Sequence, residues 1–192
     1  VVISSGSIER PLVFGNNDTP GVMLSSAAKE YLKVYGVLVG KKPIVFTNND
    51  SGYETAIEFK KNGINPIVLD TRKNPNSEII KEAKNLNINI KFSYVVVAAK
   101  GYKKVKSADI AKISDDKKNI SNIENIKCDC ICVSGFWTPT IHLASQSGNK
   151  TKFNEEIDAF IPSQSKQNET TLGSAYGIFT LEETLKTSFE KG

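Results

Sequence analysis

Between residues 43 and 70, apolar and polar positions follow one another in the order strand, turn, helix, strand. The run from Pro43 to Thr47 is short and apolar, as in a buried strand, and Asn48 to Gly52 has the composition of a tight turn. Tyr53 to Phe59 then carries apolar side chains at helical spacing, and Ile64 to Leu69 returns as a second buried strand. We therefore predict a βαβ unit, the building block of dinucleotide-binding sheets.

The ends of the predicted helix also carry recognisable signals. Ser51 and Glu54 stand three residues apart, the spacing of a capping box, and predict that the helix begins there. Asn62 and Gly63 predict its end. In a dinucleotide-binding unit, an acidic residue about 20 positions beyond the turn meets a ribose hydroxyl. Asp70, at the end of the second strand, occupies that position.

The turn itself lacks the glycines that a dinucleotide requires. A binding unit has Gly-x-Gly-x-x-Gly, whereas this chain has Thr47-Asn48-Asn49-Asp50-Ser51-Gly52 and keeps only the third glycine. Asn49 and Asp50 place bulk and negative charge where the backbone would approach a pyrophosphate. We expect a Rossmann-like scaffold whose own nucleotide site is lost.

Segments on either side extend this unit. Val22 to Tyr35 is amphipathic, and its periodicity predicts a helix with Tyr31 and Tyr35 on the same side as Ala28. A helix over residues 76–86 and an alternating strand at 88–92 follow Asp70. Residues 95–99 and 105–113 alternate around Lys100-Gly101 and predict an antiparallel hairpin. The predicted fold class is therefore α/β, with a Rossmann-like parallel sheet and an antiparallel strand meander.

The first residues predict a strand followed by a small turn. Val1 to Ile3 is apolar and has no initiator methionine before it, so we expect the chain to be an excised part of a longer protein. Ser4-Ser5-Gly6-Ser7 follows, and small residues after a buried strand allow a ligand or another backbone to come close. An ordinary turn is the alternative interpretation.

Composition excludes several classes of partner. The 192 residues include 39% hydrophobic residues and carry a net charge of +4, which is mild for this length. Basic residues such as those from Lys100 to Lys106 are not interleaved with aromatic ones as in a nucleic-acid module, so no nucleic-acid partner is expected. No apolar run reaches membrane-spanning length and no signal peptide is recognised. Arg72 and Lys73 could meet a phosphate on a ribose or be hydrated surface charges.

The chain offers little catalytic or metal-binding chemistry. Alternation places Cys128, Cys130 and Cys132 on one face of a strand, where they cannot surround a metal ion, and no Cys-x-x-Cys is present. Buried free thiols are expected instead, and they indicate a reducing, cytoplasmic location. His142 is the only histidine, with no Ser/His/Asp arrangement around it. We predict no catalytic residue and no metal site.

Residues Cys128 to Gly148 closely resemble a signature in the α subunit of heterotetrameric sarcosine oxidase. Further matching stretches occur in the same order along the chain: Ser5 to Phe14, Asn17 to Leu24, Val45 to Ser51, and Gly173 to Gly177. The resemblance spans essentially the whole chain. It identifies the chain as the central part of such a subunit.

The resemblance implies an architecture similar to that of two-domain disulfide reductases, in which an outer nucleotide-binding domain is split around an inserted one. Residues 1–41 and 144–192 would form parts of the incomplete outer domain, and residues 42–143 the inserted Rossmann-like domain. It further implies that NAD binds the outer domain as a structural cofactor, that covalent FMN lies between α and β subunits, and that FAD lies in β. The implied partners are β, γ and δ subunits, with no membrane partner.

The resemblance also places the nucleotide contacts. The family's last nucleotide-contacting segment falls on Gly173-Ser174, which implies contacts at Ser174, Phe179 and Leu181, with close backbone approach at Ser5 and Gly6. Flavoprotein reductases carry an acidic residue at the position of Ser174, so a serine there favours a dinucleotide other than a flavin. The family's amino-terminal glycine turn is missing, and we predict that this fragment alone binds NAD weakly or not at all.

Two details qualify this assignment. Thr180 and Glu183 have the spacing of a capping box, so the last helix would begin where a pyrophosphate can face it. Phe136 stands where the family has the second glycine of Ser-Gly-Gly-Trp, which puts a close contact at that turn in doubt.

The implied function is that of a non-catalytic portion of a complex that oxidatively demethylates sarcosine to glycine, makes hydrogen peroxide and transfers the one-carbon unit to tetrahydrofolate. Three alternatives remain open: an α-type subunit of a related amine or amino-acid dehydrogenase, a stand-alone NAD(P)H-dependent flavin disulfide reductase, and a module that binds no ligand. The reductase is disfavoured because Thr19 to Ala28, where some such enzymes place Cys-x-x-Cys, contains no cysteine.

Overall fold

In the computed structural model, which describes residues 1–191, the chain forms two compact units. The larger unit is Pro11–Phe136, and the smaller combines Val1–Arg10 with the chain from Trp137 onward. These units part at residues 10/11 and 136/137, whereas the resemblance implied boundaries at 41/42 and 143/144. Residues 22–35 pack in the larger unit because their strand pairs with the central sheet.

A five-stranded parallel sheet is the centre of the larger unit. Hydrogen bonds join its strands in this order: β3 (Val22–Leu24), β10 (Cys130–Ser134), β4 (Pro43–Thr47), β5 (Ile67–Asp70) and β6 (Asn89–Phe92). The predicted βαβ unit is β4, helix α2 and β5. The central strands β4 and β10 are buried along their whole length, as expected for a parallel sheet covered on both faces.

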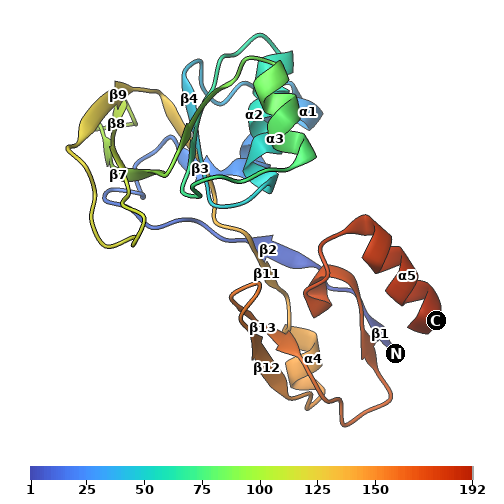
Figure 1. Cartoon of the computed structure of the whole chain (residues 1–192). Coiled ribbons are helices and arrows are strands. Elements are labelled where there is room, and N and C mark those ends of the chain that lie inside the picture. Colours follow the sequence, from blue (N-terminus) through green and yellow to red (C-terminus); the bar gives the residue numbers. More distant parts are fainter. Residues whose placement is uncertain (192) are drawn as a thin grey trace. The chain divides into compact units, whose positions relative to one another are not determined.

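Each face of the sheet is covered by a different kind of layer (Figure 1). The layer on one face consists of helices α1 (Ser25–Tyr35), α2 (Ser51–Lys61) and α3 (Glu78–Asn85). The layer on the other face is an antiparallel meander of β7 (Tyr94–Lys100), β8 (Ser107–Lys112) and β9 (Glu124–Lys127). The predicted fold class, a Rossmann-like parallel sheet with an antiparallel meander, is confirmed.

Two apolar clusters hold these layers together. Ile44 and Phe46 of β4 belong to the cluster beneath the meander, whereas Val45 between them belongs to the cluster beneath the helices. Val68 and Leu69 of β5 divide in the same way. Successive side chains of a strand point to opposite faces, so a slip of one residue in register would exchange the two clusters.

Helix α2 does not begin with the predicted capping box. Its N-cap residue is Asp50, and no side chain caps the helix. Asn49 Oδ1 instead accepts hydrogen bonds from the backbone N–H of Ser51, at 2.9 Å, and from the Ser51 hydroxyl. Glu54 forms an ion pair with Lys29 of α1 rather than reaching back to the turn. The expectation was wrong because the asparagine in the turn competes for Ser51 and the neighbouring helix competes for Glu54.

The expected buried side of α1 was also partly wrong. Ala28 is fully buried, but Tyr31 and Tyr35 are 47% and 65% exposed. Their rings lie against each other, with centroids 6.1 Å apart. Ser25 and Ala28 are the buried residues of α1, and Leu32 is partly buried against the cluster beneath the helices, so the buried stripe of α1 is narrow.

The three cysteines do not share one face. Cys130 and Cys132 lie beneath the helices with their sulfur atoms 3.6 Å apart, whereas Cys128 lies beneath the meander. Strand β10 begins only at Cys130, because the Asp129 carboxylate accepts hydrogen bonds from the backbone N–H groups of Lys41 and Lys42 and ends the alternation there. All three thiols are buried and none of them forms a disulfide, and burial raises the pKa of Cys128 to about 12.

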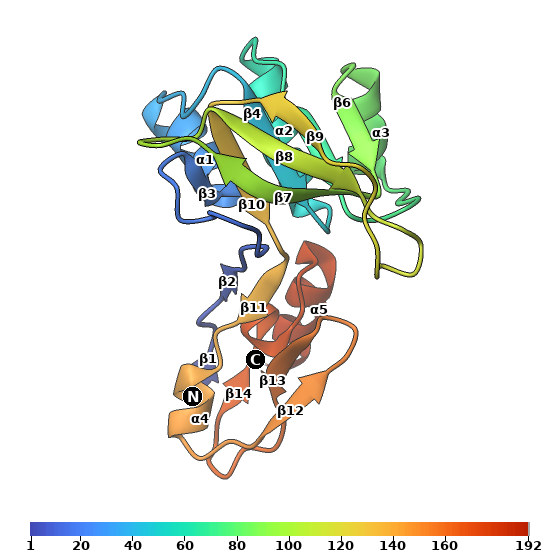
Figure 2. The same cartoon turned by 90° about the vertical axis from the view of Figure 1, so that its left-hand side faces the viewer.

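The smaller unit is built from short elements (Figure 2). Strand β1 (Val2–Ile3) pairs in parallel with β14 (Thr170–Thr171), and β2 (Ser7–Glu9) pairs antiparallel with β11 (Trp137–Pro139). The remaining elements are α4 (His142–Gln146), the hairpin β12 (Thr151–Asn154) and β13 (Ala159–Pro162), the 3₁₀ helix η1 (Gly173–Tyr176), and α5 (Leu181–Lys191). Arg10 fixes the hairpin turn through hydrogen bonds to the carbonyl oxygens of Asp158 and Ile157, at 2.7 and 3.2 Å.

Substitution of Gly52 tests the packing of α2 on β4. A Cβ added at Gly52 would lie 2.7 Å from both Cβ and Oγ1 of Thr47, which is fully buried. We therefore expect Gly52→Ala to lower the free energy of unfolding of the 192-residue chain by about 1–3 kcal/mol. Urea unfolding measures this change. Lys61→Ala, at an exposed position of the same helix, is the control and should change stability by about 0.5 kcal/mol or less; equal stability of the two variants would contradict the tight contact.

Candidate nucleotide-binding sites

The fold of the larger unit predicts where a nucleotide would bind. Beginning at β4, the chain adds β5 on one side of the sheet and β10 on the other, so the strand order reverses between β4 and β10. Ligands of open α/β sheets bind at such a point, outside the carboxyl ends of the strands. Here those ends are Thr47 of β4 and Ser134 of β10.

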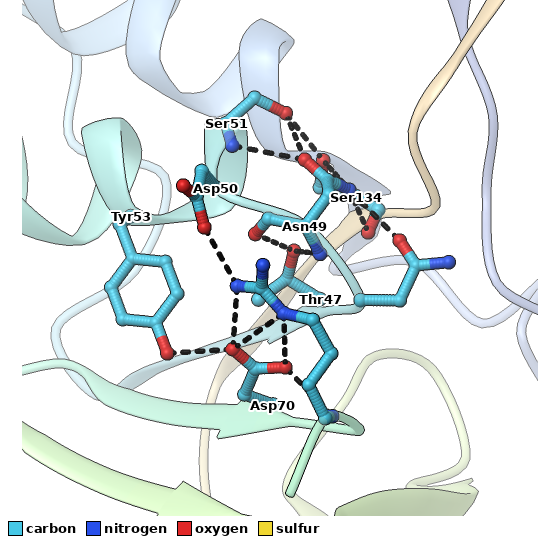
Figure 3. A network of polar contacts seen from close by, with 9 residues as sticks. Thr47, Asn49, Asp50, Ser51, Tyr53, Asp70 and Ser134 are labelled. Carbon is cyan, nitrogen blue, oxygen red and sulfur yellow. Dashed lines mark hydrogen bonds and ion pairs between the residues drawn. The ribbon is translucent and has the colours of Figure 1, made fainter. Parts of the chain in front are cut away.

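Asn49 fills this crevice (Figure 3). Its side-chain nitrogen donates hydrogen bonds to the carbonyl oxygen of Ser134 at 3.1 Å and to the Ser134 hydroxyl at 3.3 Å. Its backbone is held by Thr47, whose hydroxyl donates to Asn49 O at 2.9 Å and accepts from Asn49 N at 3.1 Å. An amide side chain therefore joins the two strand ends in the place where glycine would leave room for a pyrophosphate.

Asp70, the carboxylate expected to meet a ribose, is also hydrogen-bonded by other residues of the chain. Asp70 is fully buried, and its Oδ2 accepts a hydrogen bond of 2.7 Å from the Tyr53 hydroxyl (Figure 3). Arg72 donates to both oxygens of Asp70, with Nε at 3.1 Å from Oδ1 and Nη2 at 2.9 Å from Oδ2. The backbone N–H of Arg72 adds a hydrogen bond of 2.9 Å to Oδ1. Asp70 thus uses both oxygens within the protein.

Arg72 compensates two carboxylates at once. Beyond Asp70, its Nη2 forms an ion pair with Asp50 Oδ1 at 2.8 Å. Partial burial disfavours the charged guanidinium, but the hydrogen bonds and charges of Asp70 and Asp50 outweigh it and raise the pKa of Arg72. Lys73, by contrast, pairs with Asp115 at the surface. The sequence left the roles of Arg72 and Lys73 open. Arg72 forms ion pairs with two carboxylates within the larger unit, and Lys73 forms one at the surface.

The smaller unit brings other expected site residues together. Because β1 and β14 are parallel, with Ile3 opposite Thr171, their carboxyl ends lie at the same edge. Ser5 and Gly6 follow β1 at this edge, and Ser174 follows β14. Gly6 has a φ of +77°, and no atom lies within 4 Å of the position that its Cβ would occupy. The backbone at Gly6 is therefore open to close approach.

The side chains at this edge differ in their hydrogen bonding. The Ser5 hydroxyl donates to the carbonyl oxygen of Thr140 at 2.7 Å. The Ser174 hydroxyl makes no hydrogen bond to another residue of the described chain. Ser174 lies in η1, between Gly173 at φ +62° and Gly177 at φ +86°, a backbone that favours glycine at both positions.

Phe179 and Leu181 flank the start of α5, at the carboxyl end of the same segment. Thr180 lies directly before α5 and accepts a hydrogen bond of 3.4 Å from Glu183 N, and its hydroxyl donates to the Glu183 carboxylate at 2.8 Å. Thr180 and Glu183 thus interact at the helix start, as their spacing predicts. Leu181 is 74% exposed, whereas Phe179 is half-buried.

His142 and the acidic and cysteine residues are the remaining candidate groups for chemistry in residues 1–191. His142 is an exposed residue at the first position of α4. Within this described range, no group of three or more His, Cys, Asp or Glu residues could hold a metal ion. No helix in the same range is long and apolar enough to cross a membrane.

Sequence reasoning missed how the crevice is closed. The Asn49 bridge to Ser134 joins residues 85 positions apart, and the only signal for it was the asparagine in place of a glycine. Nothing in the sequence indicated that Tyr53 bonds to Asp70, because a tyrosine in the first turn of a helix is compatible with many environments. Phe136 has a φ of +80°, which favours glycine and accounts for the glycine of the resembling family at that position.

Comparison with known proteins identifies relatives along the whole chain. Subunit alpha of sarcosine oxidase from Corynebacterium sp. (strain P-1) is 31% identical over 194 aligned residues, covering 100% of this chain and 20% of the relative. The same subunit from Rhizobium meliloti (strain 1021) is 33% identical over 176 residues, covering 91% of this chain and 17% of the relative. The chain is therefore homologous to a segment of sarcosine oxidase subunit alpha. The predicted resemblance is confirmed, and the chain spans about a fifth of these relatives' length.

No protein-family model matches the chain. Among solved structures, thioredoxin reductase of T. acidophilum matches 100% of this chain and 62% of its own with a TM-score of 0.77 and 16% identity. L-proline dehydrogenase from P. horikoshii matches 91% of this chain and 29% of its own with a TM-score of 0.58 and 22% identity. These likenesses concern the fold.

The buried hydroxyl of Tyr53 makes stability depend on pH in a specific way. Burial first, and the charge of Asp70 second, raise the pKa of Tyr53 far above its ordinary value of about 10. The folded chain therefore holds this proton more tightly than the unfolded chain does. The resulting stabilisation is complete below pH of about 10 and decreases as pH rises beyond it, by up to about 1.4 kcal/mol per pH unit.

Tyr53→Phe tests this linkage. At pH 7 we expect the variant to lose about 1–3 kcal/mol of unfolding free energy, because buried Asp70 loses a donor. The difference from the unsubstituted chain should shrink above pH of about 10, since, of the two side chains compared at position 53, only tyrosine titrates there. Urea unfolding from pH 7 to 11 measures both effects. Tyr102→Phe, at a side chain 93% exposed, is the matched control, and equal behaviour of the two variants would contradict the network.

Proposed function

We propose that this chain is a non-catalytic, NAD-binding portion of a sarcosine oxidase α subunit. In this proposal the smaller unit is part of the split outer nucleotide-binding domain, and the larger unit is the domain inserted into it. Under this proposal the domain boundaries lie at residues 10/11 and 136/137, where the compact units divide, and not at 41/42 and 143/144, as the sequence resemblance implied. The nucleotide contacts are Ser5, Gly6, Ser174, Phe179 and Leu181.

One observation carries this proposal: the larger unit fills its nucleotide crevice with its own side chains, whereas the strand ends of the smaller unit are open. Asn49 joins the ends of β4 and β10, and Arg72 and Tyr53 use both oxygens of Asp70. At the edge of β1 and β14, in contrast, Gly6 has free space beside its backbone and the Ser174 hydroxyl has no partner in the described chain. This contrast supports a nucleotide site in the smaller unit.

The residue at position 174 supports NAD rather than a flavin. An acidic side chain at this position would hold the ribityl and phosphate region of a flavin, as the sequence resemblance implies, and Ser174 supplies no charge. The family's amino-terminal glycine turn, which would supply most of the pyrophosphate contacts, is not part of this chain. The fragment alone then retains NAD weakly or not at all.

The rest of the function lies in the complex. Carbon–nitrogen oxidation would take place in another subunit, with FAD in β and covalent FMN between α and β. The complex would also contain γ and δ subunits, release hydrogen peroxide and pass the one-carbon unit to tetrahydrofolate. Buried cysteines without disulfide bonds fit a reducing cytoplasm.

The nucleotide retained by the full-length α subunit tests the proposal. After purification and denaturation, chromatography of the released nucleotide should identify NAD. Release of FAD would contradict the assignment at Ser174, and release of no nucleotide would support a module that binds no ligand.

Two variants of the full-length subunit locate the nucleotide. Ser174→Asp places a negative charge where the pyrophosphate is proposed to lie and should reduce the retained NAD about tenfold or more, equivalent to about 1.4 kcal/mol of binding free energy. Lys73→Ala, at the carboxyl end of β5 in the larger unit, is the control and should leave the retained NAD unchanged. Loss of NAD with Lys73→Ala alone would place the nucleotide in the larger unit.

A further inference from the structure

The loop between β7 and β8 projects from the larger unit, and its backbone is held in place (Figure 2). Gly101 has a φ of +155°, and a Cβ at this position would lie 1.9 Å from the carbonyl oxygen of Lys104, so the loop closes tightly on itself. Val105 is buried in the cluster beneath the meander, and its backbone N–H donates to the carbonyl oxygen of Pro20 at 2.9 Å. The exposed residues of this loop are therefore presented on a fixed backbone, which lowers the entropy cost of binding a partner.

The loop carries three exposed lysines, Lys103, Lys104 and Lys106. A fourth lysine, Lys100 at the end of β7, forms an ion pair of 3.1 Å with Asp109 of β8 and is compensated there. The three lysines of the loop have no such partner among residues 1–191. Their charges therefore face solvent.

Neighbouring segments add further lysines to this surface. Lys127 of β9 lies opposite Ser107, the residue directly after the loop. The Asp129 carboxylate accepts hydrogen bonds from the backbone N–H groups of Lys41 and Lys42, at 2.8 and 2.7 Å. We call the following six exposed side chains the basic patch: Lys41, Lys42, Lys103, Lys104, Lys106 and Lys127. Six lysines and Asp129 give the patch a charge of +5, against +4 for the whole chain, so the remaining residues together are close to neutral.

A tyrosine stands within the basic patch. Tyr102 is 93% exposed and makes no hydrogen bond or ring contact with another residue of the described chain. It therefore contributes little to the packing of the larger unit, in contrast to Val105 of the same loop, which is 1% exposed. Tyrosine is enriched among the residues that contribute most of the binding energy at protein interfaces, because its ring is largely apolar and its hydroxyl can form a hydrogen bond.

We propose that the basic patch docks a partner protein through an acidic surface of that protein, with Tyr102 as the anchor. Carboxylates of the partner meet lysines that have no ion-pair partner in the described chain, and this complementarity speeds association and selects the partner. A nucleic acid is the other common polyanion. Proteins that bind single strands stack successive bases on several aromatic side chains, whereas this loop offers one. The proposal goes beyond the proposed function and does not depend on which nucleotide is bound.

Binding of an acidic peptide to the full-length polypeptide tests the proposal. The probe is a fluorescein-labelled peptide of about ten residues, with glutamates around a central pair of leucines, and fluorescence anisotropy measures its affinity at low salt. Lys103→Glu combined with Lys104→Glu should weaken binding about tenfold or more. Lys117→Glu combined with Lys118→Glu, the matched control, makes the same charge change at an exposed turn beyond the other end of β8 and should weaken binding less than about threefold. Tyr102→Ala should weaken binding about fivefold and leave its salt dependence unchanged.

The other outcomes overturn the proposal. Absence of peptide binding, or equal weakening by the two charge reversals, shows that the patch is not a specific docking surface. Unchanged affinity in Tyr102→Ala removes the anchor, and tighter binding of a labelled oligothymidylate of the same length assigns the patch to nucleic acid. Acetylation of the unsubstituted polypeptide gives the decision if a variant fails to fold. The peptide should slow acetylation of Lys103 and Lys104 but not of Lys117 and Lys118, and equal acetylation of both pairs overturns the proposal.

Discussion

A buried carboxylate determines how the larger unit is organised at the carboxyl ends of its strands. Asp70 is fully removed from solvent, and such a charge is stable only when cations and hydrogen-bond donors surround it. Arg72 and Tyr53 supply them, and Asp50 binds the outer side of the same guanidinium. The network ties the turn after β4, the start of α2 and the end of β5 together. A ribose hydroxyl could reach Asp70 only by displacing groups that compensate a buried charge.

The crevice next to this network is closed by a second and independent set of contacts. Asn49 joins Thr47 and Ser134 at the point where the strand order reverses. The third glycine of the dinucleotide pattern is nevertheless retained, and its reason is visible: at Gly52, helix α2 approaches Thr47 too closely for a side chain. The glycine that serves helix packing is kept, while the positions that would serve the ligand carry polar side chains. The packing of α2 on β4 thus requires Gly52 whether or not a nucleotide binds.

The smaller unit shows the opposite condition. Its strand ends at Gly6 and Ser174 are open, but its sheet has only two strands and its last helix has no buried residue. The same features that make its edge available to a nucleotide also leave its apolar surface uncovered.

The sequence by itself determined the layered α/β fold of the larger unit, the loss of the glycine turn and the homology to subunit alpha. These depend on local periodicity and on motifs that are contiguous in the chain, such as Cys128 to Gly148. Only the tertiary structure decided which side chains fill the crevice and which faces stay exposed. Asn49 meets Ser134 across 85 positions, Tyr53 meets Asp70 across 17, and Tyr31 is left exposed on the side of α1 that faces no neighbouring element of the described chain. Such contacts depend on how distant segments pack together, and a local pattern carries no record of that packing.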